Sequence, residues 1–75
     1  MTLSEMKNGQ QANIVALDVS GLDTGLLIKL TAMGFVAGSA VEVIRRAPLG
    51  RGIQLKLRGS DLCLTPSLAS RVKVA

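Results

Sequence analysis

The chain has 75 residues, of which 48% are hydrophobic, and it carries a formal net charge of +4 and no histidine. The hydrophobic content excludes a disordered chain, and the single cysteine excludes a disulfide-rich secreted fold. The longest aliphatic runs, residues 14–17 and 26–28, are too short to span a bilayer, and polar residues interrupt the N-terminus where a signal peptide would be apolar. We therefore expect one domain over residues 1–75, in the cytoplasm and with no direct insertion in a membrane.

The N-terminal part of the chain predicts a turn and a first strand. Leu3 and Met6 stand three residues apart, so a single helical turn can bring both to one end of a core. Asn8-Gly9 marks the turn that follows. Residues 12–19 then alternate as a strand, with Val15, Leu17 and Val19 on one face and Ile14 and Ala16 on the other.

Residues 23–33 predict the one long helix of the chain. The short side-chain oxygen of Asp23 or Thr24 can accept a hydrogen bond from a free backbone N–H group at the helix start. At about 100° per residue, an apolar stripe runs along one side of this helix. Its members are Leu26, Leu30 and Met33, with Leu27 at its edge. Ile28 lies roughly 160–200° from the stripe, so it cannot share the same core.

The helix is expected to end at a glycine. Gly34 stands where the chain reverses hand, a position with positive φ that glycine adopts at low cost. Phe35 is placed to fold back on Leu30, which is the apolar contact that accompanies such an ending. Residues 36–39, which include Gly38, turn the chain into the next strand.

The second half of the chain predicts short strands separated by turns. Residues 40–46 form a strand that ends in a tip at residues 47–52, where a proline and two glycines prevent further pairing. Apolar and polar residues alternate over residues 53–58, and Gly59-Ser60 forms a two-residue hairpin turn before residues 61–64. Thr65-Pro66 predicts one helical turn, and residues 71–74 form a fifth strand. The fold is therefore mainly β, a small antiparallel barrel of about five strands with one α-helix.

These segments, in this order, resemble the FeoA family, the small cytoplasmic accessory proteins of bacterial ferrous iron transport. The strongest part is residues 29–38, KLTAMGFVAG, where the family has R-L-x-x-(L/M)-G-(L/F)-x-P-G before an alternating strand. Residues 45–50, RRAPLG, match the family's tip, and residues 62–74 match its last segments. The resemblance rests on order and spacing over nearly the whole chain. Its structural motif residues here are Leu30, Met33, Gly34, Phe35, Gly38, Pro48, Gly50 and Gly59.

The resemblance implies an SH3-like barrel, in agreement with the five expected strands. It also implies a role, which is to bind the cytoplasmic G-protein domain of the FeoB ferrous iron transporter and to support Fe²⁺ uptake, peripheral to the inner membrane. Activating, scaffolding and sensing roles are all compatible with it. Four positions depart from the family pattern without affecting the core: Lys29 replaces Arg, Ala37 and Gly52 replace Pro, and Thr65 replaces Arg.

The titratable residues predict neither catalysis nor a bound metal or cofactor. Without histidine, every Ser-His or Cys-His nucleophile pair is excluded, and the carboxylates are scattered along the chain. Fe²⁺ favours clusters of imidazole, thiolate or carboxylate ligands. Cys63 is out of phase with its apolar neighbours, and we interpret it as a small half-buried residue. Iron is therefore expected to be held elsewhere, with no tightly bound metal here.

Two surfaces are candidates for binding a protein partner. One is a basic set, Arg45, Arg46 and Arg51 at the tip, with Lys56 and Arg58 on the next strand. The other is an apolar patch of Ile28, Leu27 and Leu49. A contiguous exposed apolar patch usually marks an interface, whereas basic side chains mainly raise the association rate. Both sets have an alternative interpretation as ordinary solvated faces.

Two other functions are weighed against this one. An SH3-like module of a metal-dependent repressor would need a pair of DNA-binding helices, and the chain predicts no such pair. A small basic RNA-associated barrel would need aromatic side chains for base stacking, and Phe35 is the only aromatic residue. We therefore expect no nucleic acid among the partners.

Overall fold

A computed structural model of the chain describes residues 1–47 and 51–75. The motif residues Pro48 and Gly50 and the patch residue Leu49 lie outside this described part. The elements in chain order are η1 (Leu3–Glu5), β1 (Gln11–Leu17), α1 (Thr24–Met33), β2 (Ala40–Arg46), β3 (Ile53–Leu57), β4 (Ser60–Leu64), α2 (Pro66–Ala69) and β5 (Val72–Val74). The expected class is confirmed: the fold is mainly β, with one long α-helix and one short helical turn.

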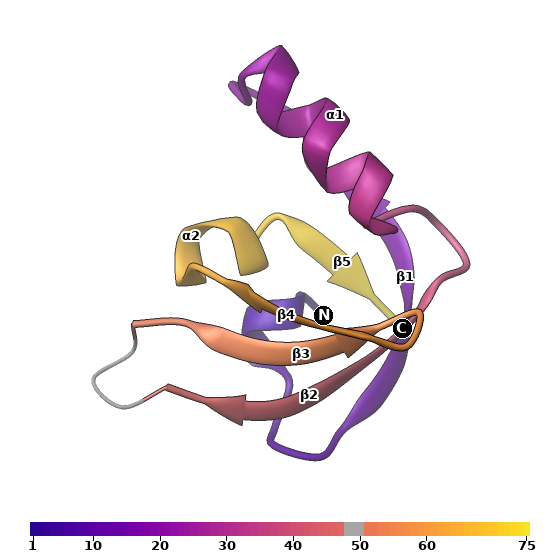
Figure 1. Cartoon of the computed structure of the whole chain (residues 1–75), viewed down its shortest axis with the longest axis vertical. Coiled ribbons are helices and arrows are strands. Elements are labelled where there is room, and N and C mark those ends of the chain that lie inside the picture. The colour runs from indigo at the N-terminus through magenta and orange to yellow at the C-terminus, as the bar shows by residue number, and fades with distance from the viewer. Residues whose placement is uncertain (48–50) are drawn as a thin grey trace.

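The five strands form one antiparallel sheet in the order β4-β3-β2-β1-β5. β1 divides its pairing between two neighbours, because residues 11–13 pair with β2 and residues 14–17 pair with β5. The sheet therefore curls around its own inner face, as Figure 1 shows. The N-terminal residues cover the edge at β5, where the Val74 N–H group donates to the Met1 carbonyl oxygen at 2.8 Å.

A bulge in β1 changes which of its side chains face the core. The register with β5 shifts between Ile14 and Ala16. Ile14 is buried and Leu17 packs against the core, whereas Val15 is 52% exposed. The expectation that Val15 and Leu17 share a face was therefore wrong, because the extra residue of a bulge turns the side chains beyond it to the opposite face.

The core fills the inside of the curled sheet and is closed at one end by η1. Leu3 and Met6 are fully buried there, as the spacing of these two residues predicts. The alternation of β3 is also confirmed, since its three apolar residues are buried and its polar residues face outward. The buried hydrophobic residues are Leu3, Met6, Ile14, Leu30, Phe35, Val41, Val43, Ile53, Leu55, Leu57, Leu64, Ala69, Val72 and Val74.

Helix α1 begins and ends as its sequence predicts. The Asp23 carboxylate accepts a hydrogen bond from the Leu26 N–H group at 3.2 Å. At the other end Gly34 has φ of 109°, and its N–H group donates to the Thr31 carbonyl oxygen at 3.1 Å. The Phe35 N–H group donates to the Leu30 carbonyl oxygen, also at 3.1 Å. This pair of bonds is the Schellman ending, and it satisfies carbonyl groups that a helix end otherwise leaves free.

The β3–β4 hairpin packs directly on that ending. Its two-residue turn is Arg58-Gly59, with φ of 53° and 83°, and Ser60 pairs with Leu57. The turn therefore lies one residue before the expected Gly59-Ser60. Gly34 is buried beneath the hairpin, and a Cβ atom placed on it would lie 2.7 Å from Cδ of Arg58. Space and backbone conformation thus both require glycine at this position.

We predict that substitutions can separate the effect of the positive φ from the effect of the close contact with Arg58. Gly34→Val should lower the free energy of unfolding by more than about 1 kcal/mol, because a β-branched residue is strained at positive φ. Gly38 also has positive φ, of 93°, but no atom lies within 4 Å of its Cβ position. Gly38→Ala should therefore cost less than Gly34→Ala in urea unfolding, and equal costs would contradict the contact with Arg58.

Candidate protein-binding surfaces

Helix α1 presents an apolar surface to solvent. Its sequence, TGLLIKLTAM, holds one charged residue, Lys29. Ile28 is 65% exposed, the highest value among the exposed large hydrophobic residues, and Leu27 beside it is half-buried. Thr31 and Ala32, one turn further along, are also exposed. We call Ile28, Thr31 and Ala32, with Leu27 at the edge, the outer face of α1.

The inner side of the same helix rests on the barrel. Leu30 is buried, and Leu26 and Met33 pack against the core, so the predicted stripe is confirmed. Figure 1 shows the ribbon of α1 approaching the sheet most closely at its C-terminal end, while Leu26 near its N-terminal end also packs against the core. A helix with apolar residues on all sides is usually buried. Where one side of such a helix is exposed, that side is typical of a protein-binding surface.

The basic residues of the tip form a separate surface. Arg45 and Arg46 lie at the end of β2, and Arg51 precedes β3; all three are exposed. These strand ends lie well away from α1 in Figure 1. The described residues therefore do not join the outer face of α1 and the basic residues into one patch.

Arg46 has a structural role that the sequence did not reveal. Its Nη2 donates to the carbonyl oxygen of Ser4 and, at 2.5 Å, to that of Met6. Its backbone N–H group donates to Oδ1 of Asn8 at 3.1 Å. Arg46 thus holds η1 and the following turn against β2. Its guanidinium is hydrogen-bonded within the chain while the residue stays exposed, and its place among the partner-facing arginines remains a prediction.

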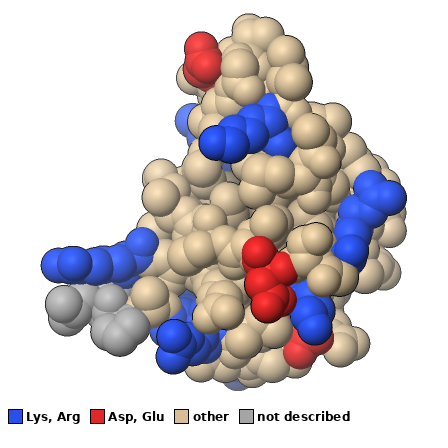
Figure 2. Space-filling view, in the orientation of Figure 1, with Lys and Arg blue, Asp and Glu red and all other residues tan. Residues whose placement is uncertain are grey.

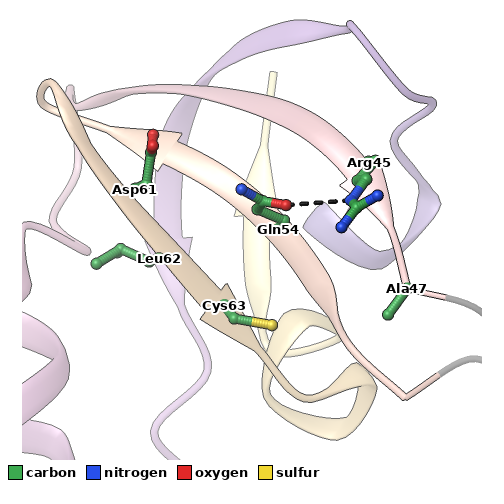
Figure 3. Close-up of a pocket in the computed structure, with 6 residues that line it drawn as sticks. All are labelled: Arg45, Ala47, Gln54, Asp61, Leu62 and Cys63. Atoms are coloured by element: carbon green, nitrogen blue, oxygen red, sulfur yellow. Dashed lines mark hydrogen bonds between the residues drawn. The ribbon is translucent and has the colours of Figure 1, made fainter.

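Arg45 borders a cavity with a volume of about 340 Å³. The cavity lies over β2, β3 and β4, and its lining residues are Arg45, Ala47, Gln54, Asp61, Leu62 and Cys63 (Figure 3). Nε of Arg45 donates to Oε1 of Gln54 at 3.2 Å. The lining offers one carboxylate, one thiol, one amide and one guanidinium, and this set contains no base paired with a nucleophile.

Metal ligands do not gather in the described part of the chain. No three Cys, Asp or Glu side chains lie close enough together there to hold an ion, and the sequence has no histidine. The absence of a tightly bound metal or cofactor stays a prediction. Two carboxyl groups have pKa values lowered by local turns: a backbone hydrogen bond from Thr2 lowers the pKa of Glu5, and one from Ser20 lowers that of Asp18. Both pKa values are therefore lowered by local hydrogen bonds at the surface of the chain.

Cys63 is exposed, and the expectation of a half-buried residue was wrong. Its side chain points into the cavity of Figure 3, on the solvent side of β4. A Cβ atom on Gly52 would lie 3.0 Å from Sγ of Cys63 and 3.3 Å from the Leu64 carbonyl oxygen. The thiol therefore packs over Gly52, which accounts for glycine where the family pattern often has proline.

The outward charges of the sheet alternate in sign. Cross-strand pairing places Glu42 beside Lys56 and Lys56 beside Asp61. Figure 2 shows the basic side chains of one face at separated positions, with acidic side chains near the centre. The face shown carries no continuous basic groove, and the sequence has one aromatic residue, whereas proteins that bind single-stranded nucleic acids use both a basic groove and several stacking aromatics.

No helix in residues 1–47 and 51–75 has the length and apolar character needed to cross a membrane.

A curled five-stranded sheet with a capping helix defines the class of the protein, a small SH3-like barrel. The family model of the FeoA domain matches residues 1–75. The chain belongs to the FeoA family, a family of small accessory proteins of ferrous iron transport. No curated protein matches the chain.

Solved structures of FeoA proteins share this fold. The FeoA protein of Chlorobium tepidum is 30% identical with a TM-score of 0.87, over 99% of this chain and 68% of that one. Iron(II) transport protein A of Clostridium thermocellum is 38% identical with a TM-score of 0.87, over 99% of this chain and 44% of that one. FeoA of Stenotrophomonas maltophilia, solved with zinc and described as an SH3 domain protein, is 26% identical with a TM-score of 0.86, over 100% and 89%.

Metal-dependent repressors show the same fold at lower identity. A manganese-dependent transcriptional repressor is 17% identical with a TM-score of 0.83, and this chain covers 40% of its length. This likeness concerns the fold alone.

The two neighbouring arginines of β2 provide a direct test of the assignments above. Arg46→Ala should lower the free energy of unfolding by about 1–2 kcal/mol, since it removes charge-assisted hydrogen bonds to two carbonyl groups. Arg45→Ala removes one exposed bond to a side chain and should change it by less than about 0.5 kcal/mol. Urea unfolding of both variants measures the difference, and the reverse order would contradict the role of Arg46.

Proposed function

We propose that the protein is a non-enzymatic, cytoplasmic accessory of bacterial ferrous iron uptake that binds the G-protein domain of the transporter FeoB. The observation that carries the proposal is the outer face of α1, where Ile28 is 65% exposed on a helix with a single charge. Membership of the FeoA family supports the connection with iron uptake. The Fe²⁺ ion is the cargo of the transporter in this proposal, and no residue of the chain needs to hold it.

The outer face of α1 serves as the anchor of the complex. Complete burial of an isoleucine side chain contributes about 1.5–3 kcal/mol, and residues of this kind at the centre of an interface provide most of the affinity. Thr31 and Ala32 are small, so they leave room for a partner to reach Ile28. The helix is held rigidly at its Schellman ending, which limits the entropy lost on binding.

Arg45 and Arg51 serve to steer the encounter. Both are exposed and distant from the anchor, and charges at such positions act mainly on the association rate and on orientation. Arg46 contributes less because its guanidinium is bonded to η1. The chain thus approaches an acidic surface of the transporter domain, while α1 provides the lasting contact.

Binding kinetics with the soluble G-protein domain of FeoB test this division of roles. Ile28→Asp should abolish binding and leave the fold intact, because the contact would have to desolvate a carboxylate. Val15→Asp is the matched control, since Val15 is 52% exposed on β1 and lies outside the outer face. Reversal of Arg45 and Arg51 to Glu should slow association and flatten its salt dependence, with a smaller effect on dissociation.

Two results would contradict the proposal. Equal loss of binding in Ile28→Asp and Val15→Asp would show that α1 is not the anchor. Collapse of wild-type binding at high salt, with Ile28→Asp unaffected, would make the arginines the anchor instead.

A further inference from the structure

Strand β4 leaves one edge of the sheet open. It pairs with β3 alone, whereas the opposite edge of the sheet at β5 is covered by Met1 and Thr2. The two-residue turn makes Leu57 and Ser60 a hydrogen-bonded pair, so alternate residues of β4 direct their backbone groups toward β3. Asp61 and Cys63 therefore direct theirs outward. Within the described residues, neither has a further backbone hydrogen bond.

An apolar groove borders this open edge. It lies between α1, β4 and α2 and has a volume of about 180 Å³. Its lining residues are Leu26, Lys29, Leu30, Met33, Cys63, Leu64 and Leu68. Lys29 is the only charged residue of the lining, and it is exposed. The groove lies on the side of α1 opposite the outer face, so it is a second surface, and it does not depend on the FeoB proposal.

We propose that the edge of β4 and this groove bind an extended, apolar segment of a partner protein as an added strand, with an acidic side chain of the segment beside Lys29. The outward N–H and C=O groups of Asp61 and Cys63 match the free backbone groups of an extended segment, whereas a helix has its backbone groups bonded internally, so the proposed occupant is a strand. The apolar lining selects aliphatic side chains at alternate positions of the segment. The single cation without a neighbouring anion in the lining selects a carboxylate.

The size of the site sets the expected strength of binding. Asp61 and Cys63 together provide two backbone N–H donors and two C=O acceptors, so the segment that pairs with β4 is short. Each hydrogen bond adds little net stability because it replaces a bond to water, and the contact is therefore weak and reversible. Leu26, Met33 and Leu68 are half-buried already, so a segment gains apolar contact without rearrangement of the core.

The probe is the acetylated peptide Thr-Val-Thr-Asp-Thr-Val-amide, whose Asp and Val side chains share one face of the strand, added at millimolar concentration to the ¹⁵N-labelled protein. Binding should slow hydrogen exchange at the Asp61 and Cys63 amides, which are open in the free chain, and should leave the Leu62 amide unchanged because it already pairs with β3. Two N-methylated peptides are the controls. One is methylated at the alternate residues whose N–H groups face β4, and the other at the residues whose N–H groups face away from it. Only the first should bind more weakly, by about tenfold or more.

Two variants separate the backbone from the charge. Cys63→Pro removes the outward N–H group without breaking a bond to β3 and should weaken binding, whereas Cys63→Ala should not. Lys29 lies on the helix surface. Lys29→Glu should reverse the preference for an acidic peptide, so that the peptide with Lys in place of Asp binds better than the original peptide. If Cys63→Pro impairs folding, Lys29→Glu still tests the proposal.

Three outcomes would overturn the proposal. One is unchanged exchange at Asp61 and Cys63 with the peptide present. Another is equal binding of both N-methylated forms. The third is protection of these amides that rises with protein concentration without peptide, which would make a second copy of the chain the occupant of the edge.

Discussion

The ending of α1 at Gly34 is the constraint on which the rest of the structure depends. Its positive φ, the bond from Phe35 to the Leu30 carbonyl and the burial of both side chains fix the direction in which the helix leaves the barrel. Arg58, at the turn of the β3–β4 hairpin, covers this glycine and ties the helix end to the sheet. The contacts at this end, together with the packing of Leu26 against the core, hold both surfaces of α1 in place.

This arrangement leaves apolar side chains of α1 accessible on two sides of the helix. The described residues hold neither a cluster of metal ligands nor a paired nucleophile and base, yet they present an apolar helix with solvent on one side and a groove on the other. Apolar contact provides affinity without a reactive group, and dispersed charges provide orientation. These exposed surfaces support the proposed binding role, and the chain belongs to a family of small accessory proteins.

Local sequence signals predicted much of the fold, and long-range pairing accounts for what they missed. The caps of α1, the glycine ending, the alternation of β3 and the proline-led turn of α2 each depend on neighbouring residues. The bulge of β1 and the one-residue shift of the hairpin turn depend on strand register, which the sequence does not encode locally. Arg46 bonds to carbonyl groups about 40 residues away, and no pattern distinguishes it from Arg45. For the candidate site, the sequence predicted the exposure of Ile28, because its helical angle excludes it from the core.

The central claim is that a partner contacts the outer face of α1. The most direct measurement is an NMR titration of the ¹⁵N-labelled chain with the unlabelled G-protein domain of FeoB. The account predicts that the amide signals of Ile28, Thr31 and Ala32 shift or broaden first, before those of β2 and β3. Changes confined to the outward face of the sheet around Arg45 and Lys56, with α1 unaffected at saturation, would contradict it.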